Sequence, residues 1–78
     1  MTVLEKLTAI FREEFENDSL VIDESTTPTH IEKWDSLAMI NIIVASEWEF
    51  KIKFDTTEIK SIRGVSEILQ IIENKTKR

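Results

Sequence analysis

The chain has 78 residues, enough for one small domain, and we expect residues 1–78 to form a single domain. Its 15 acidic and 10 basic residues give a net charge of −5, which argues against nucleic acid as a partner, because phosphate backbones bind clustered Lys and Arg. The absence of cysteine excludes disulfides and thiolate-bound metals, and without a secretion signal or a long apolar run we expect a cytoplasmic protein with no membrane insertion.

The N-terminal segment is predicted to be a helix over residues 2–16. Thr2 and Glu5 have the spacing of a capping box, in which each side chain accepts a hydrogen bond from an unpaired amide of the first turn. The apolar residues recur at helical spacing and form one stripe for burial: Val3, Leu7, Ile10, Phe11 and Phe15.

Residues 17–34 have no sustained apolar period and are predicted to be a loop. Thr27-Pro28 and the many Asp, Ser and Thr residues around it are typical of turns. Four apolar residues are expected to anchor this loop on the core: Leu20, Ile22, Ile31 and Trp34. A loop of this length in so small a domain is usually functional or well anchored.

A second helix is predicted over residues 36–50, with Asp35 or Ser36 as its N-cap. At 100° per residue it has two apolar sides. The expected core side carries Met39, Ile42, Ile43, Ser46 and Phe50. The opposite side carries Leu37, Val44 and Trp48 around Asn41, with Ile40 at the edge. This second side either docks a partner or, for Val44 and Trp48, folds under a neighbouring loop.

The C-terminal part is predicted to contain an extended connector and two helices. The connector "KIKFD" has no strand to pair with. Asp55 and Glu58 have capping-box spacing for a short helix over 56–60. Ser61 is the expected cap of a last helix over 62–75, whose first turn Gly64 weakens. The buried stripe of that helix comprises Ile62, Val65, Ile68, Leu69 and Ile72. Three longer helices and one short helix together predict an all-α, four-helix bundle.

Ser36 is the residue whose position at a helix start permits chemistry. Hydrolysis would need a base to activate the hydroxyl, and the single histidine, His30, lies in the predicted loop with no triad around it. The sequence has no metal-ligand spacing and no glycine-rich phosphate loop. A phosphate ester on Ser36 would lie near the positive end of the helix dipole. From Asp35 and Ser36 alone, an ordinary helix cap is the simpler interpretation.

The whole pattern resembles the acyl and peptidyl carrier protein family over almost the full length of the chain. "DSLAMINIIVASEWEF" is similar to the family's Asp-Ser-Leu followed by an apolar helix that ends in Glu-x-x-Phe. "KIKF" is similar to the link that follows, and "TTEIKSIRGVSEILQII" to the short third helix and the final helix. The resemblance implies a carrier protein with a prosthetic group and not an enzyme.

The resemblance also implies roles for particular residues. Ser36 is the expected attachment site of phosphopantetheine, which a phosphopantetheinyl transferase takes from coenzyme A. The thiol of the arm then holds an acyl or aminoacyl group as a thioester. Asp35 and Leu37 are expected to contact the transferase, and partner enzymes are expected to dock on Asn41, Val44, Glu47 and Trp48. Such partners include an acyl- or aminoacyl-loading ligase, a ketosynthase and an acyltransferase, and the carrier is expected to be a monomer.

Two departures from the family pattern bear on the pathway. Lys33 replaces the Gly that often lies two residues before the Asp, and Trp34 completes "WDSL". Fatty-acid carriers have acids along the outer face of this helix, where we place Ala38, Asn41 and Trp48 and only Glu47 and Glu49 as acids. We therefore favour a specialised biosynthetic pathway. The alternatives are a housekeeping fatty-acid carrier, a D-alanyl-type aminoacyl carrier, and an unmodified helical module that dimerises through its apolar patch.

Overall fold

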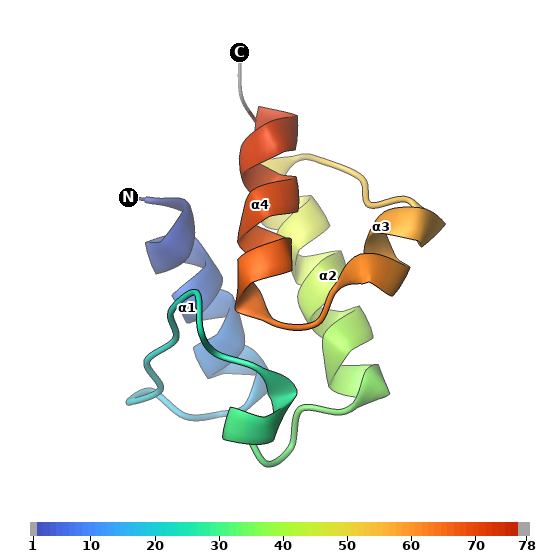
Figure 1. The fold of residues 1–78 in the computed structure, drawn as a ribbon. Coiled ribbons are helices and arrows are strands. Elements are labelled where there is room, and N and C mark those ends of the chain that lie inside the picture. The colour runs from blue at the N-terminus through green and yellow to red at the C-terminus, as the bar shows by residue number, and fades with distance from the viewer. Residues whose placement is uncertain (1, 77–78) are drawn as a thin grey trace.

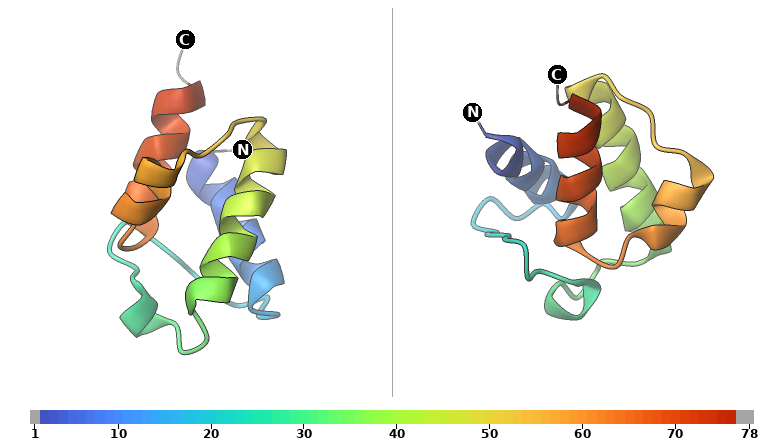
Figure 2. Two further views of the ribbon diagram at one scale, coloured as in Figure 1. Left: turned by 90° about the vertical axis from the view of Figure 1, so that its right-hand side faces the viewer. Right: turned by 45° about the horizontal axis from the view of Figure 1, so that its top comes forward.

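The computed structural model describes residues 2–76 and consists of helices joined by irregular segments (Figure 1). The α-helices are α1 (Val3–Glu14), α2 (Ser36–Phe50), α3 (Thr56–Ser61) and α4 (Val65–Thr76), and η1 (Pro28–His30) is a single 3₁₀ turn. Helix α1 runs antiparallel to α2 and α4 and packs against both (Figures 1 and 2). The predicted all-α bundle of three longer helices and one short helix is confirmed. The expected domain of residues 1–78 includes Met1, Lys77 and Arg78, which lie outside the described residues.

Helix α1 has the predicted cap but is shorter than predicted. The Thr2 hydroxyl accepts the Glu5 amide at 3.1 Å, and the Glu5 carboxylate accepts the Thr2 amide at 2.9 Å, so the capping box is confirmed. Helical geometry ends at Glu14, not at residue 16, because Glu16 adopts a left-handed φ of 50°. The Asn17 amide then donates to the Arg12 carbonyl at 2.9 Å, which closes the helix end.

The long loop between α1 and α2 is anchored as predicted. Ile22, Ile31 and Trp34 are buried and Leu20 is partly buried. Inside the loop, Asp23 accepts hydrogen bonds from the side chain and the backbone amide of Ser25, and these bonds lower the pKa of the Asp23 carboxyl. The η1 turn was not predicted, although proline at the first helical position favours such a turn.

The connector after α2 is extended, as predicted, and it forms no strand within the described residues. Lys51 ends α2 in a left-handed conformation with a φ of 57°. The Asp55–Glu58 capping box is present, with bonds of 2.7 and 2.9 Å. Helix α3 follows and ends at Ser61, one residue later than predicted.

The predicted start of the last helix at residue 62 is wrong, because α4 begins at Val65. Ile62 is instead the C-cap of α3, and the Ser61 hydroxyl donates to the Glu58 carbonyl rather than capping α4. Gly64 therefore does not weaken the first turn of α4. It lies against the long loop, where the Val65 amide donates to the Thr26 carbonyl at 2.9 Å. A Cβ atom on Gly64 would lie 2.6 Å from that same carbonyl oxygen.

One apolar core joins the helices and the long loop. Leu7 and Phe11 of α1, and Ile42 of α2, are completely buried. The predicted stripe of α4 is buried as well, with Ile62 contributing from the turn before the helix. Fully burying each large aliphatic side chain is worth about 1.5–3 kcal/mol, so this core is the main source of stability. Within residues 2–76, no helix has both the length and the apolar character required to cross a membrane.

Candidate functional site

Ser36 is the first residue of α2, and its side chain is exposed. Asp35 is the N-cap: its Oδ1 accepts the Ala38 amide at 2.9 Å, and its carbonyl accepts the Met39 amide at 2.9 Å. The Asp35 side chain thus satisfies one of the unpaired amides at the start of the helix. Because the cap is provided by Asp35, the Ser36 hydroxyl is not needed for capping and faces solvent at the positive end of the helix dipole.

An apolar hollow of about 480 Å³ adjoins Ser36. Residues of the long loop, α2 and α3 line it: Pro28, Trp34, Asp35, Ser36, Met39, Ile40 and Ile59. Trp34 is only 6% exposed, and its ring meets the Phe11 ring edge-on at 5.1 Å. Its indole N–H has no hydrogen-bond partner among the described residues. Ser36 is therefore bordered by a mostly apolar surface.

The side of α2 that carries Trp48 is exposed to solvent. We use the term outer face for Leu37, Ile40, Val44 and Trp48, whose side chains are 67, 55, 46 and 81% exposed. Neither Val44 nor Trp48 folds under a neighbouring loop. On the opposite side Ile42, Ile43 and Ser46 are buried as predicted, whereas Met39 and Phe50 are partly buried. A row of exposed large apolar side chains on one helix is typical of a protein-binding surface.

Ala38 is not on the outer face, and its predicted placement there is wrong. It is 5% exposed and belongs to the core cluster. The cause is the packing of α1 against α2, which covers a wider part of α2 than the predicted stripe. Ser46 is completely buried among apolar residues, and its hydroxyl donates to the Ile42 carbonyl at 2.8 Å, which makes that burial tolerable.

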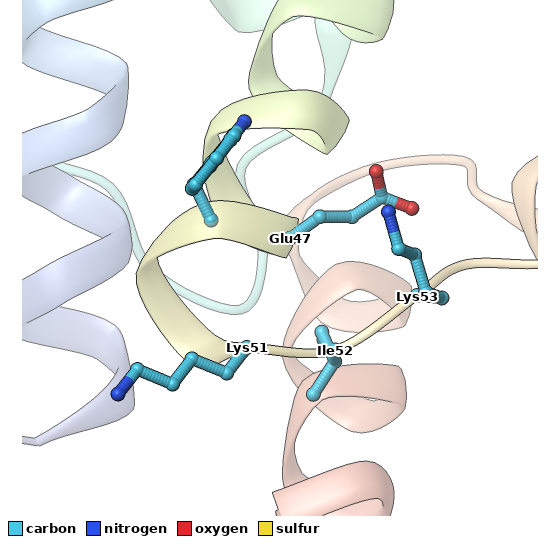
Figure 3. Close-up of a pocket in the computed structure, with 5 residues that line it drawn as sticks. Glu47, Lys51, Ile52 and Lys53 are labelled. Atoms are coloured by element: carbon cyan, nitrogen blue, oxygen red, sulfur yellow. The ribbon is translucent and has the colours of Figure 1, made fainter.

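Two of the candidate partner-binding residues also make contacts inside the chain. The Asn41 amide donates to the Glu14 carboxylate of α1 at 3.0 Å. The Glu47 carboxylate accepts the Phe54 amide at 2.8 Å and so holds the connector against the end of α2. Figure 3 shows Glu47 and Lys53 extending from one side of this region and Lys51 from the other.

The structure also brings acidic residues of α1 to the outer face of α2, which the sequence analysis missed. Glu13 and Glu14 line a hollow of about 340 Å³ together with Ile10, Asn41, Ala45, Trp48 and Glu49. The pattern of the second predicted helix by itself gives only Glu47 and Glu49 as acids on this side. The signal was present in the polar side of the first predicted helix, but pairing that side with α2 requires knowledge of how the two helices pack.

A catalytic or metal-binding arrangement is not found in the part of the chain that the structure describes. The Nδ1 atom of His30 accepts the Thr27 amide at 3.0 Å within the η1 turn, which occupies that nitrogen locally. No group of three or more His, Cys, Asp or Glu side chains within residues 2–76 is arranged to hold a metal ion.

No protein-family model and no curated protein sequence matches the chain. Among solved structures, the chain is similar to the solution NMR structure of holo acyl carrier protein from Geobacter metallireducens. The TM-score is 0.87 and the sequence identity is 37%, over 96% of this chain and 86% of that chain.

This similarity covers almost the whole chain. At this identity and coverage the relationship extends beyond the fold and agrees with the resemblance in the "DSL" segment. An acyl carrier protein is a carrier and not an enzyme, so the expectation of a non-enzymatic protein is confirmed by this relationship. The chain belongs to the acyl carrier protein family.

Proposed function

We propose that this protein carries acyl or aminoacyl groups as thioesters on a phosphopantetheine arm attached to Ser36. The observation that carries the proposal is the exposed Ser36 hydroxyl, one residue after the capping Asp35, in a chain 37% identical to a holo acyl carrier protein. The phosphodiester of the arm would lie beside the first amides of α2, where the helix dipole favours negative charge.

A phosphopantetheinyl transferase supplies the arm from coenzyme A in this proposal, and Asp35 and Leu37 contact that enzyme. The Ser36 oxygen attacks the β-phosphorus of coenzyme A, so a new phosphodiester bond forms as the pyrophosphate bond breaks. The 3′,5′-adenosine bisphosphate leaves, and the hydroxyl proton is lost. Leu37 is suited to an apolar contact because its side chain is 67% exposed directly after the serine.

A specialised biosynthetic pathway is supported by the outer face of α2. Leu37, Val44 and Trp48 offer apolar contacts where fatty-acid carriers are expected to offer acids. Asn41 and Glu47 border these residues and complete the proposed enzyme-docking side. A loading ligase, a ketosynthase or an acyltransferase would use it to reach the arm. The mass of the cargo on protein isolated from its native host separates this pathway from fatty-acid and D-alanyl carriers.

Intact-mass measurement after incubation with coenzyme A and a broad-specificity transferase tests the attachment site. The wild-type protein should gain one phosphopantetheine, and Ser36→Ala should gain none. Because the sequence contains no cysteine, thiol titration gives a second readout: one thiol per modified chain and none on Ser36→Ala. An arm that persists in Ser36→Ala, or a wild-type protein that no transferase modifies, would reject the proposal.

A further inference from the structure

Trp48 is the most exposed large apolar side chain of the described residues, at 81%, and it lies far from the attachment site. It follows Ser36 by 12 positions in α2, which at about 1.5 Å per residue is roughly 18 Å along the helix axis. It does not line the hollow beside Ser36. Contact with the arm or its cargo at that hollow therefore does not explain why a tryptophan is exposed here.

Two separate hollows meet at Trp48, and opposite charges line them. One hollow, of about 420 Å³, is formed by the end of α2 and the connector: Glu47, Trp48, Lys51, Ile52 and Lys53 (Figure 3). The other is the hollow of about 340 Å³ between α1 and α2, which contains Glu13, Glu14 and Glu49. Trp48 therefore stands between a side with two lysines and a side with three glutamates.

Hydrogen bonds inside the chain hold one glutamate on each side of Trp48 in place. On the connector side, Glu47 accepts the Phe54 amide, while Lys51 and Lys53 are exposed. Lys51 is directed away from Glu47 and Lys53 by the left-handed turn that ends α2 (Figure 3). On the α1 side, Glu14 accepts the Asn41 amide, while Glu13 and Glu49 are exposed. Both hydrogen-bonded glutamates keep their charge. The connector side therefore has a net positive charge, with two lysines against Glu47, and the α1 side has a net negative charge, with three glutamates against Lys6, which borders Glu13 and Glu49.

We infer that Trp48, with Lys51 and Lys53 on one side and Glu13 and Glu49 on the other, forms a docking surface for a partner protein. That partner presents an apolar pocket for the indole, carboxylates facing the two lysines and cationic side chains facing the two glutamates. Tryptophan is enriched among the residues that dominate binding energy, and complementary charges set orientation and association rate. The inference rests on the proposed carrier function, in which an enzyme must approach Ser36 in one orientation.

The charge arrangement distinguishes this surface from a uniformly acidic one. A partner with only basic residues would gain from the three glutamates but would be repelled by Lys51 and Lys53. A partner with charges of both signs can bind in one orientation about Trp48. In the orientation turned by 180° like charges would face each other, so binding would be unfavourable. The surface therefore fixes the direction from which the partner reaches the serine.

Carbodiimide cross-linking in an extract of the native host identifies the partner, because this reagent joins an amine directly to a carboxylate. We expect Lys51 or Lys53 to be joined to Asp or Glu of one protein. The same products should form with Ser36→Ala, since the surface does not include the arm. A wild-type protein that carries no arm in its native host but still gives these cross-links would reject the carrier proposal and leave the docking inference standing. A wild-type protein that carries the arm but gives no cross-links at Lys51 or Lys53 would reject the docking inference and leave the carrier proposal standing.

Titration calorimetry with the purified partner then measures how much the indole and each pair of charges contribute to binding. Trp48→Ala should weaken binding about 30-fold, the loss typical of a central anchor residue. Two double variants reverse the charges on one side each, and each should weaken partner binding by about 10-fold or more. They are Lys51→Glu with Lys53→Glu, and Glu13→Lys with Glu49→Lys. Lys60→Glu with Arg63→Glu makes the same charge change as the first pair at other exposed positions and should alter binding less than about 2-fold. Circular dichroism checks that each variant is folded.

Three further results would overturn the inference. Tighter binding after reversal of the two lysines would mean that the partner is basic on both sides. Unchanged affinity of Trp48→Ala would remove the anchor. Lysine cross-links only to a second copy of this chain, together with concentration-dependent sedimentation, would assign the surface to self-association instead.

Discussion

Asp35 and Ser36 are neighbours at the start of α2, and only Asp35 caps the helix. Asp35 has the N-cap bond to the Ala38 amide, and this leaves the Ser36 hydroxyl exposed and available for modification. The sequence indicated that one of the two would cap the helix and could not say which, because Ser and Asp are almost equally favoured at that position. The assignment depends on which residue has the extended backbone, and that residue is Asp35.

Substitutions at Asp35 separate its capping role from its proposed role in transferase recognition. Asp35→Ala should lower the free energy of unfolding by about 1 kcal/mol, because the Ala38 amide loses its acceptor. Asp35→Asn keeps an acceptor oxygen and should change stability by only a few tenths of a kcal/mol, roughly the spread among good capping residues. Urea unfolding measures both values.

The same two variants test whether the Asp35 carboxylate has a role beyond capping. If the transferase contacts it, Asp35→Asn should lower kcat/KM for modification although the protein remains as stable as the wild type. An Asp35→Asn protein that is modified at the wild-type rate would restrict Asp35 to capping.

At the scale of helices and loops, the capping signals in the sequence predicted the starts of α1, α2 and α3 correctly and the start of α4 wrongly. The boxes at Thr2–Glu5 and Asp55–Glu58 are both present, and α2 has the predicted bounds. Ser61 was wrongly predicted to cap the last helix, which begins only at Val65. The segment before Val65 packs through Gly64 against Thr26, a residue remote in sequence, so this start could not be predicted from local signals. The outer face of α2 was predicted from periodicity, whereas the burial of Ala38 and the approach of Glu13 required the packing of α1 on α2.

Gly64→Ala tests the contact between the long loop and the turn before α4. The new Cβ would lie 2.6 Å from the Thr26 carbonyl oxygen, so the loop or the turn must move and the Val65–Thr26 hydrogen bond is strained. We expect the free energy of unfolding to fall by about 1–3 kcal/mol, as for other overpacked sites.

Gln70→Ala is the matched control for Gly64→Ala, because Gln70 is exposed on α4 and helices favour alanine. Its stability should stay within about 0.5 kcal/mol of the wild type. Equal stability of Gly64→Ala and the wild type in urea unfolding would show that the turn adjusts without cost.

For the whole molecule, stability depends on one small core that the helices and the long loop build together. Phe11 of α1 is completely buried, and its ring lies 5.1 Å from Trp34 of the loop and 6.0 Å from Phe15. The sequence predicted the members of this core well, because apolar period and burial coincide. It could not predict which of them touch, and so did not foresee that an aromatic pair joins α1 to the residue just before Asp35.

Phe11→Ala should therefore affect the molecule as a whole. Replacing a buried Phe by Ala costs about 3–5 kcal/mol, and a domain of this size has roughly that much net stability. We expect a largely unfolded protein at 25 °C by circular dichroism, whereas Phe11→Leu should remain folded with a lower urea midpoint. A Phe11→Ala protein with an unchanged midpoint would contradict the view that this contact is central to the fold.

The contrast between the two tryptophans has an optical consequence. Trp34 is shielded against Phe11 near Ser36 at the start of α2, and Trp48 is exposed to water near the other end of α2. The native chain thus contains two intrinsic fluorophores, one emitting at short wavelength and protected from acrylamide, the other emitting at long wavelength and readily quenched. Each can be isolated by replacing the other with phenylalanine, so events at the two ends of α2 can be followed separately without an added dye.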